Sequence, residues 1–532
     1  MSAKSNSSDS NGPEGAVERA RPHELWLVLL LALLVRLPTL FSRPLWYDEA
    51  FAALFSAEGP RAMSYGTLLV DQGIAADVHP LGYYTLLWIW QAVSGGGPVA
   101  VRALSVILGL VLVYLGYRLS RRLFQERIAI VAALMFALSP FQVHYSQEVR
   151  MYVLLSVLLL GATLVYRRAL MGGSLQYWLA FAILGAAAQY THTLAALYLI
   201  PLGLTPLWRR QASKLGKTVL AGLFAMMLYL PWLVYVPSQL SRVRWAYWIP
   251  QPGPAELVRT WLVFVAGLPV PQSLLAVVLF STVLSTTFGA WGTIRGWRSK
   301  DPSFQDGIWL LYLAVAPVLL MYLISYWQPV YLERALLTSG ALFLIWLAWA
   351  LSAPRLIPLF AWTGRAALLL TFALGLYGYY SYGGFPYAPW PLLNDFLRVE
   401  LLEQEIVLHS NKITALPSRY YAERTTSGLE TELADGTLNP GLEHRYLPDP
   451  PGTDSDTLAP ATQEVLGFLA EPDLDRAISG ASGVWFVLFS REELDYLAEG
   501  YAAHPSLEKL AEQFTLDSVS QFGELGVYHY VK

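Results

Sequence analysis

The sequence contains no cysteine, which excludes disulfide bonds, thiol catalysis and thiolate metal sites. Charged side chains are also scarce. They make up 14% of the residues, whereas a soluble domain carries about a quarter. The net charge of −3 gives no indication of nucleic-acid binding. In place of charges the chain has a series of long apolar runs between Glu24 and Tyr382, which predicts a polytopic all-α membrane protein.

A membrane helix needs roughly twenty mostly apolar residues, and this length selects the predicted spans. Eleven segments are chosen, of which 127–141 and 175–190 are short. Two further apolar stretches, about 80–94 and 257–270, are expected to lie as helices at the membrane interface. The predicted spans are 24–41, 99–119, 127–141, 149–166, 175–190, 193–208, 217–236, 272–294, 306–325, 335–352 and 363–382.

Basic clusters set the expected orientation, because short cytoplasmic loops carry the excess of Lys and Arg. With eleven spans all clusters fall on one side. The polar tail 1–22 is then a disordered cytoplasmic segment, and the long loop 42–98 lies outside. The expected location is a bacterial plasma membrane, with multiple passes. The clusters are Arg19 and Arg21; Arg121, Arg122 and Arg127; Arg167 and Arg168; Arg209, Arg210, Lys214 and Lys217; Arg295, Arg298 and Lys300; and Arg355.

Residues 383–532 are predicted to form a small water-soluble α/β domain outside the membrane, after a membrane module at 23–382. Glu405–His409 and Gly483–Phe489 are the predicted strands, and Ser490 is expected to cap the helix that follows the second. A further helix is expected near 417–423, and alternating segments at 514–519 and 525–531 close the chain. The sequence of this domain shows no glycine-rich phosphate loop.

Two segments of the first outer loop carry acids. Asp48 and Glu49 follow the first span directly, and paired carboxylates at a membrane boundary are costly unless they are hydrated, paired or functional. The alternative is that Asp48 caps the next helix. Further along, Asp77 and His79 are two residues apart and can converge on one ligand, or belong to a capping segment before Pro80.

A third segment, 139–152, joins two spans on the outside and contains Glu148 and Arg150, which are candidates for a site or for an interfacial ion pair. His192 lies near the outer end of the fifth span and is a candidate ligand or a satisfied polar residue. Arginines at outer helix ends either snorkel to the headgroups or together bind a lipid phosphate. They are Arg36, Arg102, Arg150, Arg259 and Arg334.

These three segments, in this order, resemble the GT-C superfamily of membrane glycosyltransferases over residues 24–350. Within it, the chain resembles the branch of protein O-mannosyltransferases and the lipid A aminoarabinose transferase. The matching residues are Asp48-Glu49, Asp77-Val-His79-Pro80-Leu81-Gly82 and Ser146-Gln-Glu148-Val-Arg150-Met-Tyr152. Tyr83 stands where the mannosyltransferase pattern has a lysine.

The resemblance implies a sugar donor on a polyprenyl phosphate, with Asp48 as the base, Glu49 as its neighbour and Glu148 as a second acid. The residue chemistry agrees: a carboxylate can take the acceptor proton, arginines can stabilise the departing phosphate, and one displacement inverts the anomeric centre. The substrate-binding residues expected are Asp77, His79, Tyr83, Arg102, Tyr145, Arg150, Tyr152, His192 and Arg334.

Several choices stay open at this level. The acceptor is a protein, a lipid or a glycan, and membrane lipids surround the enzyme. A divalent metal is optional, with Asp48, Asp77 and His79 as its candidate ligands. The alternatives to an enzyme are a transporter or glycolipid flippase and a non-catalytic scaffold. No internal repeat typical of transporters is visible, and the acids cluster at the outer surface.

Overall fold

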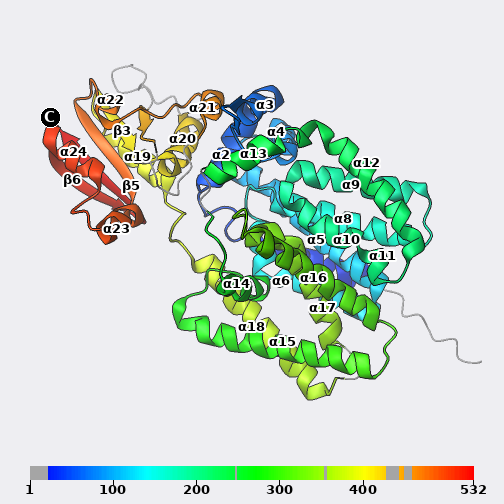
Figure 1. The fold of residues 1–532 in the computed structure, drawn as a ribbon. Coiled ribbons are helices and arrows are strands. Elements are labelled where there is room, and N and C mark those ends of the chain that lie inside the picture. The colour runs from blue at the N-terminus through cyan, green and yellow to red at the C-terminus, as the bar shows by residue number, and fades with distance from the viewer. Residues whose placement is uncertain (1–21, 246–248, 353–355, 427–441, 449–457) are drawn as a thin grey trace, which may run out of the picture.

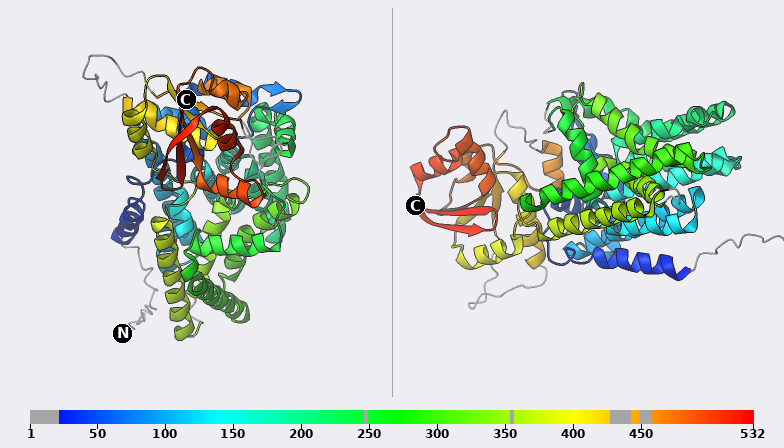
Figure 2. Two further views of the ribbon diagram at one scale, coloured as in Figure 1. Left: turned by 90° about the vertical axis from the view of Figure 1, so that its left-hand side faces the viewer. Right: turned by 90° about the horizontal axis from the view of Figure 1, so that it is seen from below.

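The computed structural model describes residues 22–245, 249–352, 356–426, 442–448 and 458–532. Most of the predicted tail 1–22 and the basic residues Arg19, Arg21 and Arg355 lie outside these ranges. A helix bundle forms the larger part, and a sheet with flanking helices lies at one end of it (Figures 1 and 2).

Within the described residues, seven helices are long and apolar enough to cross a membrane. These helices coincide with the long apolar runs of the sequence. In lipid the backbone polar groups must be satisfied internally, and a helix does this within one segment. Short 3₁₀ turns, η2 (Ala212–Lys214), η3 (Gln272–Leu274) and η4 (Glu333–Leu336), precede three of them. The seven are α5 (Pro98–Leu123), α8 (Tyr152–Leu170), α12 (Leu215–Leu233), α15 (Leu275–Arg298), α16 (Phe304–Ile324), α17 (Leu337–Leu351) and α18 (Pro358–Ser381).

The other four predicted spans are helical but shorter than the length that a straight crossing needs, so the eleven-span topology stays a prediction. One of them is split at Leu204 into two short helices. These elements are α1 (Pro22–Val35), α6 (Glu126–Leu138), α9 (Leu175–Thr191), and η1 (Thr193–Ala195) with α10 (Ala196–Gly203) and α11 (Thr205–Trp208).

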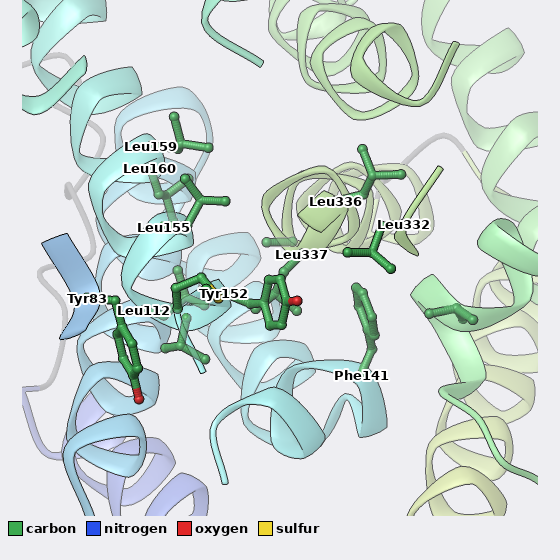
Figure 3. Packing of buried hydrophobic residues seen from close by; sticks show 14 of the residues in the cluster. Tyr83, Leu112, Phe141, Tyr152, Leu155, Leu159, Leu160, Leu332, Leu336 and Leu337 are labelled. Atoms are coloured by element: carbon green, nitrogen blue, oxygen red, sulfur yellow. The ribbon is translucent and has the colours of Figure 1, made fainter. Parts of the chain in front are cut away.

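The centre of the bundle is α17, whose residues are buried along its whole length. Figure 3 shows Leu155, Leu159 and Leu160 of α8 on one side of this core and Leu336 and Leu337 on the other. Small residues permit the close packing around α17: a Cβ added at Gly292 of α15 would lie 2.3 Å from the Ala350 carbonyl oxygen. The core therefore holds the helix ends that carry the site residues in fixed positions.

The first loop contains helices and a small hairpin rather than an irregular chain. Its elements are α2 (Tyr47–Ala57), α3 (Gly59–Leu68), β1 (Val70–Asp71), β2 (Ile74–Ala75) and α4 (Gly82–Ser94). The predicted helices at 80–94 and 257–270 are observed as α4 and α14 (Pro254–Ala266), and α4 begins after Pro80 rather than at it. Two further short helices lie outside the first loop, α7 (Pro140–Tyr145) and α13 (Val236–Trp245).

The C-terminal part contains a mixed sheet in the order β4-β3-β5-β7-β6. The neighbours of β3 are parallel to it, while β7 pairs antiparallel with both β5 and β6. The predicted strands at 405–409 and 483–489 are confirmed as β3 and β5; the helix after β5 begins at Ser490 itself, with Phe489 as its N-cap. The elements are α19 (Trp390–Glu400), β3 (Glu405–His409), α20 (Lys412–Thr426), β4 (His444–Tyr446), α21 (Pro460–Leu466), α22 (Leu474–Ala477), β5 (Gly483–Phe489), α23 (Ser490–Ala498), α24 (Pro505–Gln513), β6 (Thr515–Phe522) and β7 (Leu525–Val531).

The basic loops gather at the end of the bundle opposite to this sheet. Arg167 and Arg209, from two different clusters, both pair with Asp306 at the start of α16. The far end of α16 lies roughly 30 Å away and leads into η4, which carries Arg334. The two ends of the membrane module therefore differ in chemistry as the charge pattern of the sequence indicates.

Candidate active site

A cavity of about 1420 Å³ lies between the first loop, the helix ends of the membrane module and the C-terminal sheet. Seven of the residues singled out from the sequence line it, although they come from five separate segments of the chain. These seven are Asp48, Asp77, His79, Arg150, Tyr152, His192 and Arg334. The cavity is larger than a small-molecule pocket of roughly 300–1,000 Å³, and so has room for two substrates.

Asp48 lies in the first turn of α2, but it is not the helix cap. Trp46 is the N-cap residue, and the Glu49 side chain, at 3.4 Å, accepts from its backbone N–H. The Asp48 carboxylate is thus directed to other partners. Arg334 donates to its Oδ2 at 3.2 Å, and the Arg150 Nε lies 3.6 Å from the same atom. The predicted capping alternative for Asp48 is therefore wrong.

The surroundings of Asp48 hold more positive than negative charge. Arg150 precedes α8 and is almost fully buried, while Arg334 in η4 lies over the Tyr152 ring, 5.3 Å from its centroid. Burial on its own raises the pKa of Asp48, but Arg150 and Arg334 outweigh it and hold this pKa below its usual value. The carboxylate is ionised at neutral pH, and one carboxylate facing two guanidinium groups leaves a net charge that favours an anion.

Asp77 and His79 form a hydrogen-bonded pair on the same wall. The Oδ1 of Asp77 lies 2.9 Å from the Nδ1 of His79 and also accepts from the backbone N–H of Val78. Burial on its own raises the pKa of Asp77, and His79 outweighs it so that the pKa lies below the usual value. A carboxylate acceptor places a hydrogen of His79 on Nδ1, and in the neutral ring Nε2 is then an acceptor.

His192 closes this wall from the end of α9. Its Nδ1 accepts from the backbone N–H of Leu194 at 3.2 Å, so its hydrogen lies on Nε2. Its ring contacts His79 edge-on, with centroids 6.4 Å apart, and also packs against Tyr152. The two imidazoles thus offer the site one acceptor and one donor.

Glu49 and Arg102 do not reach the cavity wall. They form a buried pair in which the guanidinium contacts both carboxylate oxygens, and the backbone N–H of Val149 donates to Glu49 at 3.1 Å. Arg102 also donates to the carbonyl oxygens of Arg43 and Pro44. This pair joins the start of α2 to the segment that carries Arg150, which is a positioning arrangement.

Glu148, Tyr145 and Tyr83 also lie behind the wall. Glu148 is buried and its Oε1 lies 3.0 Å from the Nε2 of His144, whose ring stacks on Tyr145 at 4.8 Å. Tyr83 is fully buried beside Tyr84. The third acidic segment therefore supplies a polar layer beneath Arg150, and it brings Arg150 and Tyr152 to the cavity.

The opposite wall comes from the C-terminal sheet, which the sequence did not identify as part of the site. It includes residues that follow directly after β3 and β5, together with a histidine at the start of α24. The polar residues of this wall include Ser410, Asn411, Lys412, Arg491, Glu492 and His504. All of these except His504 follow directly after one of two parallel strands, a signal that requires the strand pairing to be known.

The candidate metal ligands do not gather into one set. Asp48 faces arginines, while Asp77 binds His79. In the part of the chain that the structure describes, no group of three His, Asp or Glu side chains is arranged to hold a metal ion.

Comparison with known proteins finds one family model and several solved structures that are similar to this chain. The model of the family described as dolichyl-phosphate-mannose-protein mannosyltransferase matches residues 78–235. A comparison with curated proteins finds no match. The structure of ArnT from Cupriavidus metallidurans bound to undecaprenyl phosphate is similar, with a TM-score of 0.59 at 12% identity, over 96% of this chain and 98% of that one.

Apo ArnT from the same organism gives a TM-score of 0.58 at 14% identity, over the same shares of the two chains. The Archaeoglobus fulgidus oligosaccharyltransferase with zinc and sulfate scores 0.48 at 14% identity, over 96% of this chain and 73% of that one. The resemblance predicted from the three outer segments is confirmed. The chain has the fold of the GT-C superfamily of membrane glycosyltransferases.

Proposed function

We propose that the chain transfers a sugar from a polyprenyl-phosphate-linked donor to an acceptor at the outer face of the membrane. The observation that carries this proposal is Asp48, held between Arg150 and Arg334 on the wall of a cavity that opens beside the membrane helices. The description of the matching family and the undecaprenyl phosphate bound by ArnT, which shares the fold, support a donor of this kind.

In this proposal the donor phosphate is held by Arg150 and Arg334. Guanidinium groups bind phosphate oxygens in pairs, and both side chains already face an anionic group in the form of Asp48. A bound phosphate takes over part of their charge from the carboxylate. The pKa of Asp48 then rises from its lowered value, and the carboxylate becomes a stronger base when the donor is present.

The transfer itself is a single displacement. The acceptor O–H or N–H gives its proton to Asp48, and the acceptor atom forms a bond to the anomeric carbon. The bond from that carbon to the phosphate oxygen breaks, and its electron pair stays on the phosphate, where the two guanidinium groups stabilise it. Attack from the face opposite to the phosphate inverts the anomeric configuration.

The outer-face assignment rests on the separation between the cavity and the basic loops that meet at Asp306. Because the chain has no cysteine, single cysteines can be placed without a background. In intact cells, a membrane-impermeant maleimide is expected to label Asp71→Cys, at the exposed hairpin of the first loop, and not Ser213→Cys, beside the basic loop. The reverse pattern would place the site on the cytoplasmic side.

The activity is tested by mass spectrometry of lipids, glycans and proteins from cells that express the chain or Asp48→Asn. We expect a covalent sugar product that depends on the chain and falls about 10²–10⁴-fold in the variant. Asp71→Asn, an exposed carboxylate of the same loop, is the matched control and keeps the product. A lipid-linked sugar that crosses the membrane intact, with no product, would instead identify a transporter or flippase.

A further inference from the structure

The carboxyl ends of β3 and β5 meet at the cavity. The chain connects β3 through α20 to β4, which lies on one side of the β3–β5 pair in the strand order. After β5 it passes through α23 and α24 to β6 and β7, which lie on the other side of the pair. Since β3 and β5 are parallel neighbours, their carboxyl ends flank a topological switch point. In sheets with parallel strands, ligands bind in the crevice that opens there.

Four side chains form what we call the C-terminal crevice: Ser410, Asn411, Glu492 and His504. Ser410 and Asn411 both donate to the Oε2 of Glu492, at 2.8 and 3.1 Å. The Nε2 of His504 lies 3.1 Å from the Oε1. The Nδ1 of His504 accepts from the backbone N–H of Ser506, which fixes the hydrogen on Nε2. Three donors from two segments thus hold one carboxylate in place at the cavity.

Hydrogen bonds between the first loop and the C-terminal part hold this crevice opposite Asp48. The Thr462 hydroxyl donates to the Gly66 carbonyl at 2.8 Å, and Tyr421 accepts from the backbone N–H of Leu45 at 2.9 Å. Lys412, two residues after Ser410, lies over the ring of Tyr47, which precedes Asp48 in the chain. The two walls therefore belong to one site with a fixed spacing.

We propose that the C-terminal crevice binds the acceptor of the proposed transfer, and that this acceptor is a saccharide which presents a hydroxyl group to Asp48. The oxygens of Glu492 and Ser410 can still accept hydrogen bonds, and the second N–H of the Asn411 carboxamide can donate one, which together match sugar hydroxyl groups. Tyr496 and Tyr501 line the same wall and add aromatic faces. The inference rests on the proposed function and names its second substrate.

Other acceptor classes fit the crevice less well. An extended peptide binds by adding a strand to a sheet edge, and the edges here are β4 and β6, not the central strand ends that face the cavity. A phosphate group would meet Lys412 and Arg491 on this wall, but these two cations are outnumbered by the carboxylates of Glu492, Asp495 and Glu499. We therefore assign the lipid phosphate to Arg150 and Arg334, and the neutral, hydroxylated acceptor group to the C-terminal crevice.

The test uses Glu492→Gln and Ser410→Ala in the full chain, with Glu512→Gln, an exposed carboxylate of α24, as the control. Both crevice variants are expected to lower product formation in cells about tenfold or more, since each loses a hydrogen bond to a charged group. Purified chains in nanodiscs, titrated with undecaprenyl phosphate, are expected to bind it as the unchanged chain does. Gel filtration and thermal unfolding check that each variant folds. If Glu492→Gln does not fold, the result with Ser410→Ala decides the test.

The product itself decides the acceptor class. A new sugar linked to a hydroxyl of an existing saccharide supports the inference, whereas a sugar on a protein side chain or on a lipid without a saccharide overturns it. Weaker binding of undecaprenyl phosphate by the crevice variants, or undiminished transfer, also overturns it. Failure of the proposed function gives a different result, because then no product depends on the chain or on Asp48.

Discussion

Asp48 and Glu49 are adjacent carboxylates of one helix, yet they occupy different regions of the molecule. Glu49 is buried behind the cavity wall, with both oxygens bound to Arg102. Asp48 lines the cavity, where two arginines approach it at 3.2 and 3.6 Å. Successive residues of a helix point about 100° apart, so one acid fixes the framework while its neighbour faces the substrates. Position relative to the cavity, more than residue type, separates the two roles.

Glu49→Gln is expected to have the largest effect on stability. It leaves the guanidinium of Arg102 buried without its counter-charge, which costs about 3–5 kcal/mol of the free energy of unfolding. Asp48→Asn also takes a counter-charge from Arg150 and Arg334, but it does so on the wall of a cavity, so it is expected to cost less than Glu49→Gln. Thermal unfolding of both variants in the same detergent measures the difference. Equal destabilisation by the two changes would remove the distinction between framework and site.

Arg334→Gln sharpens the comparison on the cation side. It removes one of the two charges that are proposed to stabilise the departing phosphate, and transfer is expected to fall about 10²-fold. Arg259→Gln is the matched control, because Arg259 is largely exposed and pairs with Glu333. Its effect is expected to stay below about twofold. Initial rates with a labelled polyprenyl-phosphate sugar give both values, and similar losses would contradict the assignment of Arg334.

His79→Gln tests whether the Asp77–His79 pair, rather than Asp48, takes the proton. Glutamine keeps a polar group near Asp77 but does not act as a base at neutral pH. We expect a loss of about tenfold, that of a hydrogen bond to substrate. A loss as large as that of Asp48→Asn would assign the base to His79.

The smallest of the expected effects is a shift in the pH dependence of transfer. Asp48 acts as a base only when ionised, so transfer is lost as the pH falls through its pKa, which lies below the usual value of about 3.9 in the free chain. The profile of kcat/KM reports the free enzyme and that of kcat the donor complex. Because bound phosphate raises the pKa of Asp48, the acid limb of kcat is expected at higher pH than that of kcat/KM. Coincident limbs would contradict this coupling.

The sequence singled out seven residues that line the membrane wall of the cavity and none that line its C-terminal wall. Asp48, Asp77 and Arg150 were found because acids and cations beside long apolar runs are costly without a partner. The opposite fate of Glu49 was not predictable, since the helix cap lies at Trp46, two residues before the Asp48 of the capping alternative, and only the folded turn decides this position.

The C-terminal crevice depends on long-range pairing. Ser410 and Glu492 lie in ordinary polar sequence after two strands that were predicted individually. Their meeting follows from the parallel register of Ile406 with Val484, which no local pattern contains. The short helices of the bundle were likewise predicted as full spans, because hydropathy depends on composition alone. Packing decides where a helix such as α6 ends, and hydropathy does not contain that information.

The central claim is that a lipid phosphate replaces the Asp48 carboxylate as the partner of Arg150 and Arg334. Titration of undecaprenyl phosphate into the purified chain and into Asp48→Asn tests it directly. Loss of the competing carboxylate is expected to tighten binding of the phosphate about tenfold, while transfer is lost. Unchanged or weaker binding by Asp48→Asn would contradict the account, because the phosphate would then occupy a different place in the cavity.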